Sequence, residues 1–243
     1  MLSRSDVISR FLELFDNPTY LEIGVNKGET FHSLGNCQKI GVDPAFLFDV
    51  NAYQGNPDIG LYQISSDEFF GRLPAGKGRF DVIYLDGLHT FEQTLRDFLN
   101  ASELLRQNGV IIIDDVLPNS FDASLPDFAQ VARLRELSSQ TGTPWPFDGS
   151  WMGDVFKLPL FIESFLQQFS YATVGDNHGQ AVVWRQTRPA DALPPRSVEQ
   201  IARLDYRDTI LSRDSFNIMS LDAIVDLFQS AAAARRESEN IYR

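Results

Sequence analysis

The sequence predicts an α/β fold in which helices cover both faces of an open, mostly parallel sheet. Short apolar runs that end in acidic residues or glycine alternate with helical patterns, as in a doubly wound sheet. Residues 80–85 are apolar except for Asp81, which is typical of a strand buried on both faces. Near the C-terminal end, two further apolar runs flank the turn-forming segment 175–179, which predicts an antiparallel hairpin.

The elements follow from these patterns in chain order. Residues 1–16 should contain a helix, because the apolar residues from Val7 to Phe15 recur at helical spacing. Thr90 and Gln93 have the spacing of a capping box, and Asn108-Gly109 should end the helix that begins there. The seven expected strands are 20–23, 39–42, 61–64, 80–85, 110–113, 169–174 and 181–185. Helices are expected from Thr30, near Glu68, from Thr90, over 128–139, and from near Ser197 and Ser220.

The length of 243 residues suits one domain with appendages. We place that domain at residues 1–189, with 118–157 as a variable segment on the substrate side and 190–243 as a helical appendage. The variable segment carries a group of apolar side chains that either forms a substrate lid or packs under a long loop. Its members are Trp145, Phe147, Trp151, Met152 and Phe156.

Composition limits the partners and the compartment. A net charge of −12 disfavours nucleic acid and anionic membrane surfaces as partners. No apolar run approaches the ~20 residues of a membrane helix, and Met1–Arg10 is too polar for a signal peptide. The single cysteine, Cys37, favours a reducing compartment, so the expected location is the cytoplasm.

The residues that carry chemistry should lie at strand ends, because open α/β sheets bind ligands across the carboxyl ends of their strands. Residues 22–30 have the form E-x-G-x-x-x-G-x-T, in which Gly24 and Gly28 let the backbone approach a ligand closely. Asp43 ends the next strand, where a carboxylate can accept hydrogen bonds from ribose hydroxyls. The alternative for Asp43-Pro44 is a turn. The two features together predict a nucleoside-containing cofactor without separating S-adenosylmethionine (SAM) from NAD.

Four segments together resemble class I SAM-dependent methyltransferases. Residues 20–28 resemble the first motif of that family, 41–44 its second acidic motif, and 80–89 and 109–115 its fourth and fifth strands, in family order. The resemblance implies a Rossmann-like sheet and SAM as cofactor. Carried over by position, the residues that would hold the cofactor are Glu22, Gly24, Gly28, Asp43, Ser66, Asp67 and Asp86.

Asp-Gly-x-His at 86–89 and the doubled aspartate at 114–115 resemble the macrocin-type and novobiocin-type sugar O-methyltransferases. That resemblance implies a divalent cation, Mg²⁺, bound by Asp86, Asp114 and Asp115. Neighbouring side chains on a strand point to opposite faces, so both aspartates can bind one ion only if the chain has left the strand by Asp115. The alternative is that one of them caps a loop or pairs with a lysine.

His89 is the candidate base, beside Asp86, because a neutral imidazole can accept the proton of an acceptor hydroxyl. The alternative is that His89 only caps the following helix. His178 should lie on the same rim, where it either contacts substrate or belongs to a surface loop. The expected reaction is O-methylation of a small hydroxylated molecule, such as a sugar or secondary metabolite, by a chain that could form a homo-oligomer. The rivals are a non-catalytic SAM-binding or interaction protein and, less favoured because G-x-G-x-x-G is missing, an NAD-dependent oxidoreductase.

Overall fold

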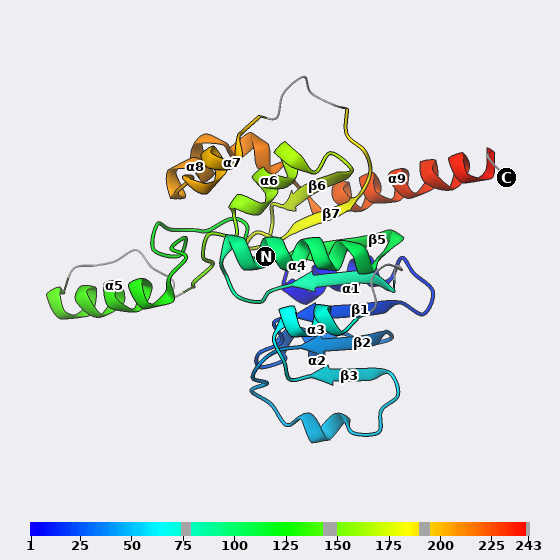
Figure 1. The fold of residues 1–243 in the computed structure, drawn as a ribbon, viewed down its shortest axis with the longest axis horizontal. Helices are drawn as coiled ribbons and strands as arrows, with labels where there is room; N and C mark the ends of the chain where they lie inside the picture. Colours follow the sequence, from blue (N-terminus) through cyan, green and yellow to red (C-terminus); the bar gives the residue numbers. More distant parts are fainter. Residues whose placement is uncertain (74–78, 143–149, 190–194, 242–243) are drawn as a thin grey trace.

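The computed structural model describes residues 1–73, 79–142, 150–189 and 195–241, which form an α/β structure around one sheet (Figure 1). The strand order is β3-β2-β1-β4-β5-β7-β6-β8, with β1 to β5 parallel and β7 antiparallel to both of its neighbours. The predicted fold class is confirmed, and the short strand β8 is added beside β6. The strands are β1 Thr19–Ile23, β2 Gln38–Val42, β3 Ile59–Tyr62, β4 Phe80–Leu85, β5 Leu105–Ile113, β6 Phe169–Val174, β7 Ala181–Arg185 and β8 Ile218–Met219.

Helices cover both faces of this sheet because the central strands are apolar on both sides. In β4, Val82 and Tyr84 pack against α1, α2 and α9, whereas Ile83 and Leu85 pack against α3, α4 and α6. The helices are α1 Arg4–Leu12, α2 Glu29–Ser33, α3 Ser66–Arg72, α4 Phe91–Leu104, α5 Phe128–Thr141, α6 Lys157–Phe165, α7 Val198–Ala202, α8 Tyr206–Leu211 and α9 Leu221–Ile241. Two 3₁₀ helices, η1 Val50–Tyr53 and η2 Arg213–Phe216, complete the described elements.

Helix α1 and the first half of α9 pack together on one face of the sheet. Ser3 and Asp6 form a capping box that starts α1, and this helix buries Val7, Ile8, Phe11 and Leu12. The ring of Phe11 packs edge-on against Phe228 of α9, with 5.6 Å between centroids. Helix α9 therefore contributes to the core, while the domain boundary at residue 189 stays a prediction.

The predicted start of α4 is confirmed, with Thr90 as its N-cap, but the predicted capping box and the predicted end are wrong. No side-chain hydrogen bond from Thr90 caps the helix, and the amide of Phe91 instead donates to Asp154 Oδ1 at 2.7 Å. The helix ends at Leu104, and Gly109 lies inside β5 rather than at a helix stop. A Cβ at Gly109 would lie 2.8 Å from the carbonyl oxygen of Asp81, at the point where the register between β4 and β5 shifts. A glycine is needed here because β4 and β5 approach each other too closely for a side chain.

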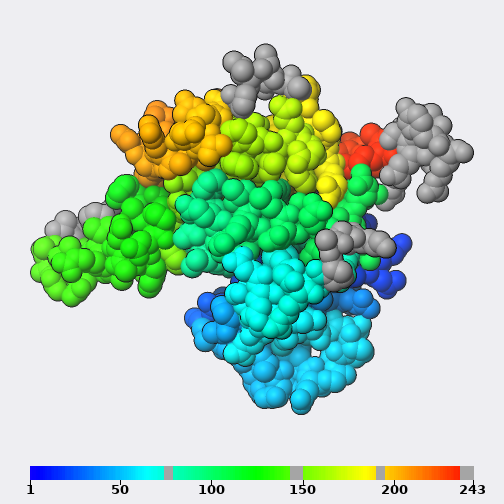
Figure 2. Space-filling model, in the orientation of Figure 1, coloured from blue at the N-terminus to red at the C-terminus, as the bar shows by residue number. Residues whose placement is uncertain are grey.

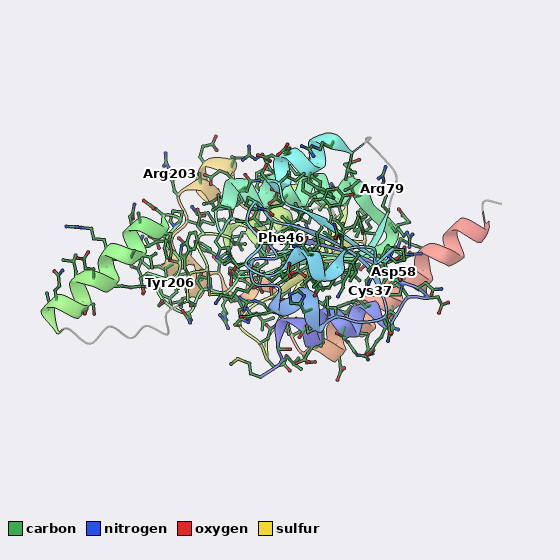
Figure 3. All side chains as sticks on the ribbon, turned by 90° about the horizontal axis from the view of Figure 1, so that it is seen from below. Cys37, Phe46, Asp58, Arg79, Arg203 and Tyr206 are labelled. Atoms are coloured by element: carbon green, nitrogen blue, oxygen red, sulfur yellow. The ribbon has the colours of Figure 1, made fainter. Side chains whose placement is uncertain are left out.

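Other predicted elements need smaller corrections. Strand β3 begins two residues before the expected 61–64, α2 is a single five-residue helix, and α6, α8 and η2 were not expected. Of the variable segment, Trp145 and Phe147 lie outside the described residues, whereas Met152 and Phe156 are buried. Helix α5 projects from the packed body in Figures 1, 2 and 3 and buries Val131. Across the described ranges, no helix is long and apolar enough to span a membrane.

Candidate active site

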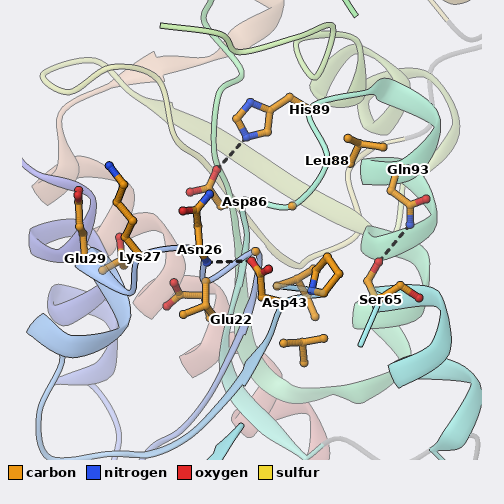
Figure 4. Close-up of a pocket in the computed structure, with 18 of the residues that line it drawn as sticks. Glu22, Asn26, Lys27, Glu29, Asp43, Ser65, Asp86, Leu88, His89 and Gln93 are labelled. Carbon is orange, nitrogen blue, oxygen red and sulfur yellow. Dashed lines mark hydrogen bonds and ion pairs between the residues drawn. The ribbon is translucent and has the colours of Figure 1, made fainter. Parts of the chain in front are cut away.

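A cavity of about 720 Å³ lies at the carboxyl ends of β1, β2 and β4 (Figure 4). Its wall includes Arg4 of α1, the loop after β1, the end of β2, the start of α3, the loop after β4, Gln93 and Trp151. Most residues predicted from the sequence meet here, namely Glu22, Gly24, Asp43, Ser66, Asp67, Asp86 and His89. Gly28, Asp114 and Asp115 are not among the lining residues.

The two glycines of the loop have different roles. Gly24 has φ +92°, and a Cβ there would lie 1.9 Å from the carbonyl oxygen of Asp86, so the ends of β1 and β4 meet backbone to backbone. Gly28 has φ +77° and precedes α2, and a Cβ there would lie 2.2 Å from Nε2 of His32. Gly24 thus shapes the cavity wall, whereas Gly28 shapes the turn behind it.

Asp43 is held in a fixed orientation at the end of β2. Its Oδ2 accepts a hydrogen bond from the amide of Asn26 at 2.8 Å, and its Oδ1 accepts one from the amide of Ala45 at 2.7 Å. Each carboxylate oxygen can still accept a second hydrogen bond from a ligand. Asn26, at φ +50°, was not predicted, and the only signal for it was its place in the glycine loop.

Gln93 joins α4 to the start of α3. Its Nε2 donates toward Ser66 Oγ at 3.1 Å, Asp67 Oδ1 at 3.2 Å and Asp97 Oδ1 at 3.1 Å. Burial raises the pKa of Asp97 to about 6, although hydrogen bonds from Ser66 and Gln93 oppose this rise. Gln93 had been interpreted as a capping residue, so its role at the cavity was missed.

Glu22 is the most buried carboxylate on the cavity wall. It is 1% exposed and accepts a hydrogen bond from the hydroxyl of Tyr20 at 2.7 Å. Burial raises its pKa to about 8 against the lowering effect of that hydrogen bond. Glu22 therefore keeps its proton at neutral pH in the free protein, where it can donate as well as accept a hydrogen bond.

His89 lies between two carboxylates and under an aromatic ring. Its Nε2 is 3.4 Å from Asp86 Oδ1, its Nδ1 is 3.1 Å from Asp115 Oδ2 and 2.7 Å from the carbonyl oxygen of Trp151. The indole of Trp151 stacks on the imidazole with 5.0 Å between centroids. Burial alone would lower the pKa of His89, but the hydrogen bond with Asp86 and the charges of Asp115 and Asp86 raise it to about 9. Protonated His89 is therefore favoured at neutral pH in the free protein.

The segment from Trp151 to Lys157 fixes this histidine in place. Gly153 has φ +62°, and a Cβ there would lie 1.6 Å from the carbonyl oxygen of His89. The carboxylate of Asp154 accepts hydrogen bonds from the amide of Phe91 at 2.7 Å and from the ammonium of Lys157 at 2.9 Å. This segment therefore holds the loop after β4.

The chain has left the strand at Asp115, as a shared cation site would require. Asp115 has φ +61°, and both aspartates of the turn after β5 are buried. Arg4 Nε pairs with Asp114 Oδ2 at 2.5 Å, and His178 Nε2 lies 3.3 Å from Asp114 Oδ1. Although burial acts to raise it, the pKa of Asp114 is lowered by His178 and Arg4, whereas burial and the charge of Asp114 raise the pKa of Asp115 to about 8. The partner of Asp114 is an arginine, not the lysine that had been considered.

Two groups of potential metal ligands occur among the described residues. Asp86, His89 and Asp115 form one, and Asp114, Asp115 and His178 form the other, with ligand atoms within 4.8 Å of one another in each. Asp86 and Asp114 fall in different groups, so the predicted set of Asp86, Asp114 and Asp115 is not gathered as one group. Within the described chain, Asp114 Oδ1 and Asp115 Oδ2 are buried and accept no hydrogen bond, which fits a site for a cation.

Residues 21–116 match the profile of a family described as a methyltransferase domain. The matched segment runs from β1 to the residue after Asp115 and includes every residue predicted for the cofactor, the cation and the base. The match supports a methyltransferase domain over this part of the chain. No curated protein matches the chain in sequence.

Solved structures with similar folds have low sequence identity to this chain. A proposed caffeoyl-CoA O-methyltransferase of Staphylococcus aureus is 15% identical with TM-score 0.49, over 76% of this chain and 85% of that one. A methyltransferase of Podospora anserina, bound to SAH, is 15% identical with TM-score 0.46, over 76% and 80%. An O-methyltransferase of Streptomyces achromogenes involved in tomaymycin synthesis, in complex with SAM, is 13% identical with TM-score 0.46, over 76% and 82%.

Proposed function

We propose that this chain is a SAM-dependent methyltransferase that methylates an oxygen of a small hydroxylated molecule, such as a sugar or secondary metabolite. One observation carries the proposal. Gly24, Asp43, Asp86 and His89 come from three strand ends and line a single cavity, within the segment that matches the methyltransferase domain. A nucleoside cofactor and a polar acceptor would therefore share one space at the carboxyl edge of the sheet.

On the cofactor side, the chain offers groups of the right kind for each part of SAM. The fixed carboxylate of Asp43 would accept hydrogen bonds from the ribose hydroxyls. Ser66 and Asp67, joined by Gln93, would contact the adenine. Glu22, Gly24 and Asp86 would face the amino acid end, where acidic groups favour the sulfonium and ammonium charges of SAM.

On the acceptor side, the reaction needs alignment and removal of one proton. The acceptor oxygen attacks the methyl carbon, the bond from that carbon to sulfur breaks, and the hydroxyl loses its proton. Alignment can contribute about 7–11 kcal/mol in favourable cases, and a positioned base about 10²–10⁴-fold. We place the hydroxyl beside His89, whose ring is held by Trp151 and Asp86.

We include a divalent cation in the proposal, held by members of the set Asp86, Asp114 and Asp115. When bound, such a cation lowers the pKa of a coordinated hydroxyl. Its charge would also offset the carboxylates that hold the proton on His89. We further propose a small-molecule acceptor rather than nucleic acid, and the cytoplasm as the location, on the charge of −12 and the single cysteine.

The test of the cofactor assignment is a calorimetric titration of SAM into the purified protein. We expect saturable binding that Asp43→Asn weakens at least tenfold, because an amide cannot accept from two backbone amides and two ribose hydroxyls. Asp58→Asn is the matched control, since Asp58 is exposed and lies outside the cavity wall. A folded protein that binds no SAM would overturn the proposal.

A second measurement separates an enzyme from a non-catalytic SAM-binding protein. The protein with SAM and Mg²⁺ or Mn²⁺ would be incubated with a panel of sugars and phenolic metabolites, and S-adenosylhomocysteine would be quantified. Acceptor-dependent product that falls in His89→Ala supports catalysis. Tight SAM binding with no turnover across the panel would favour the non-catalytic alternative.

A further inference from the structure

Asp86, Asp114 and Asp115, named here the acidic cluster, are contacted by three basic side chains from distant parts of the chain. Arg4 comes from α1, His89 from the loop after β4, and His178 from the turn between β6 and β7. The three do not share the cluster evenly. Arg4 and His178 lie closest to Asp114 and are 3.7 and 4.0 Å from Asp115 Oδ1, whereas His89 lies between Asp86 and Asp115.

Asp114 is paired from two sides by segments that are tied together. Arg4 Nε lies 2.5 Å from Asp114 Oδ2, and its Nη2 lies 3.7 Å from Asp115 Oδ1. The amide of Leu2 donates to the carbonyl oxygen of Asp176 at 3.0 Å, which fixes the start of α1 against the turn that carries His178. The start of α1 thus places Arg4, whose side chain is 41% exposed, beside the buried Asp114.

Each side of the cluster has one buried oxygen that accepts no hydrogen bond from the described residues, Asp114 Oδ1 beside His178 and Asp115 Oδ2 beside His89. The side chain of Asp115 is 4% exposed, and its Oδ2 accepts no hydrogen bond from the described residues, although Nδ1 of His89 lies 3.1 Å away. Nε2 of His89 faces Asp86 Oδ1 at 3.4 Å (Figure 4). Nδ1 of His89 lies 2.7 Å from the carbonyl oxygen of Trp151, and a ring that donates Nδ1–H to it keeps the Nε2 lone pair for a cation.

We propose that Arg4 is the resident counter-ion of Asp114, so that an exchangeable divalent cation binds the other face of the cluster, through Asp86, His89 and Asp115. The reason is electrostatic, because a cation on Asp114 would lie against the guanidinium. This ligand set replaces Asp114 of the predicted set with His89. With the cation bound, His89 is a ligand and not the base, and the cation itself lowers the pKa of a coordinated hydroxyl. An imidazole ligand suits Zn²⁺ better than Mg²⁺, and Mn²⁺ is suited by the two carboxylates. The inference rests on the cation of the proposed function and not on methyl transfer.

The two histidines provide a matched test, because each ring lies beside the Asp114–Asp115 turn. In calorimetric titrations of Mn²⁺ into the full chain, we expect His89→Ala to weaken binding at least tenfold and His178→Ala to change it less than threefold. Arg4→Met should add a second Mn²⁺ equivalent at Asp114, Asp115 and His178. Arg10→Met, on the same helix and 3.9 Å from the exposed Asp222, is its control and should change nothing.

An experiment on the unaltered chain covers the case in which a variant fails to fold. The sequence has three histidines, so their ring nitrogens can be resolved by ¹⁵N NMR. One equivalent of Zn²⁺ should shift Nε2 of His89 and leave His178 in place. Equal effects of the two histidine variants, a shift of His178 alone, or no cation binding would overturn this proposal. SAM titrated into the same samples reports separately on the proposed function.

Discussion

A Cβ atom on Gly153 would lie 1.6 Å from the carbonyl oxygen of His89. The segment that follows α5 therefore docks on the loop after β4 through backbone atoms, with no space for a side chain. Trp151 adds a ring stacked on His89, and Asp154 adds a hydrogen bond to the first turn of α4. The position of the candidate catalytic histidine thus depends on residues more than sixty positions away in sequence.

Gly153→Ala should displace this loop and destabilise the protein. The alanine has to accept a left-handed φ of +62°, which costs about 1–2 kcal/mol, and in addition a clash with His89. Gly142→Ala is the matched control, because Gly142 has φ +63° and none of the described residues lies within 4 Å of its Cβ position. Urea unfolding should show a clearly larger loss for Gly153→Ala. Equal losses of unfolding free energy would mean that the loop of His89 moves aside for the added Cβ without destabilising the protein.

Asp154→Ala should lower stability more than Thr90→Ala. Asp154 supplies the hydrogen bond that a helix cap normally provides, so its loss should cost about 0.5–2 kcal/mol. Thr90 makes no capping hydrogen bond, and its replacement should stay within about 0.5 kcal/mol. Lys157→Met isolates the second contact of Asp154. If thermal unfolding ranks Thr90→Ala as the more harmful change, the sequence-based assignment of the cap is correct after all.

The sequence was informative where one segment determines its own structure. The runs that became β4, β6 and β7 were placed to the residue, because strands buried between two layers must be apolar throughout. The end of α4 was misplaced because Asn108-Gly109 is a stop signal by local rules. In the structure, Gly109 instead meets the backbone of Asp81 on the neighbouring strand, which local rules cannot include.

The residues of the candidate site also fall into those that local sequence predicts and those that depend on distant contacts. Glu22, Gly24, Asp43, Asp86 and His89 were identified because parallel strands bring their carboxyl ends to one edge. Arg4 and Gln93 were not assigned to the site, since each reaches it from another element through a contact that no local pattern encodes. Trp151 was expected either in a substrate lid or in packing under a loop, and it lines the cavity. Arg4 had no signal beyond its place at the start of an amphipathic helix.

Glu22 should make the stability of the free protein fall as the pH rises. Its pKa is raised from 4.5 to about 8 by burial, so between these values the folded state binds the proton that the unfolded state has released. The free energy of unfolding therefore decreases with pH across this window, by up to about 1.4 kcal/mol per pH unit for a full proton. In Glu22→Gln the slope should be flatter in urea titrations at pH 5, 6.5 and 8. An unchanged slope would show that another group binds this proton.

Gln93→Leu should weaken SAM binding while leaving the fold intact. The side-chain amide of Gln93 lies within 3.2 Å of Ser66, Asp67 and Asp97 and so orients the pair proposed to contact adenine. Losing this orientation should cost about 0.5–1.5 kcal/mol, or roughly a two- to tenfold rise in the Kd for SAM. Gln140→Leu removes an exposed amide that contacts only Glu136 among the described residues, and it should leave the Kd unchanged. If Gln93→Leu leaves the Kd for SAM unchanged, the adenine lies away from α3. The orientation proposed for the cofactor in the cavity would then have to be reversed.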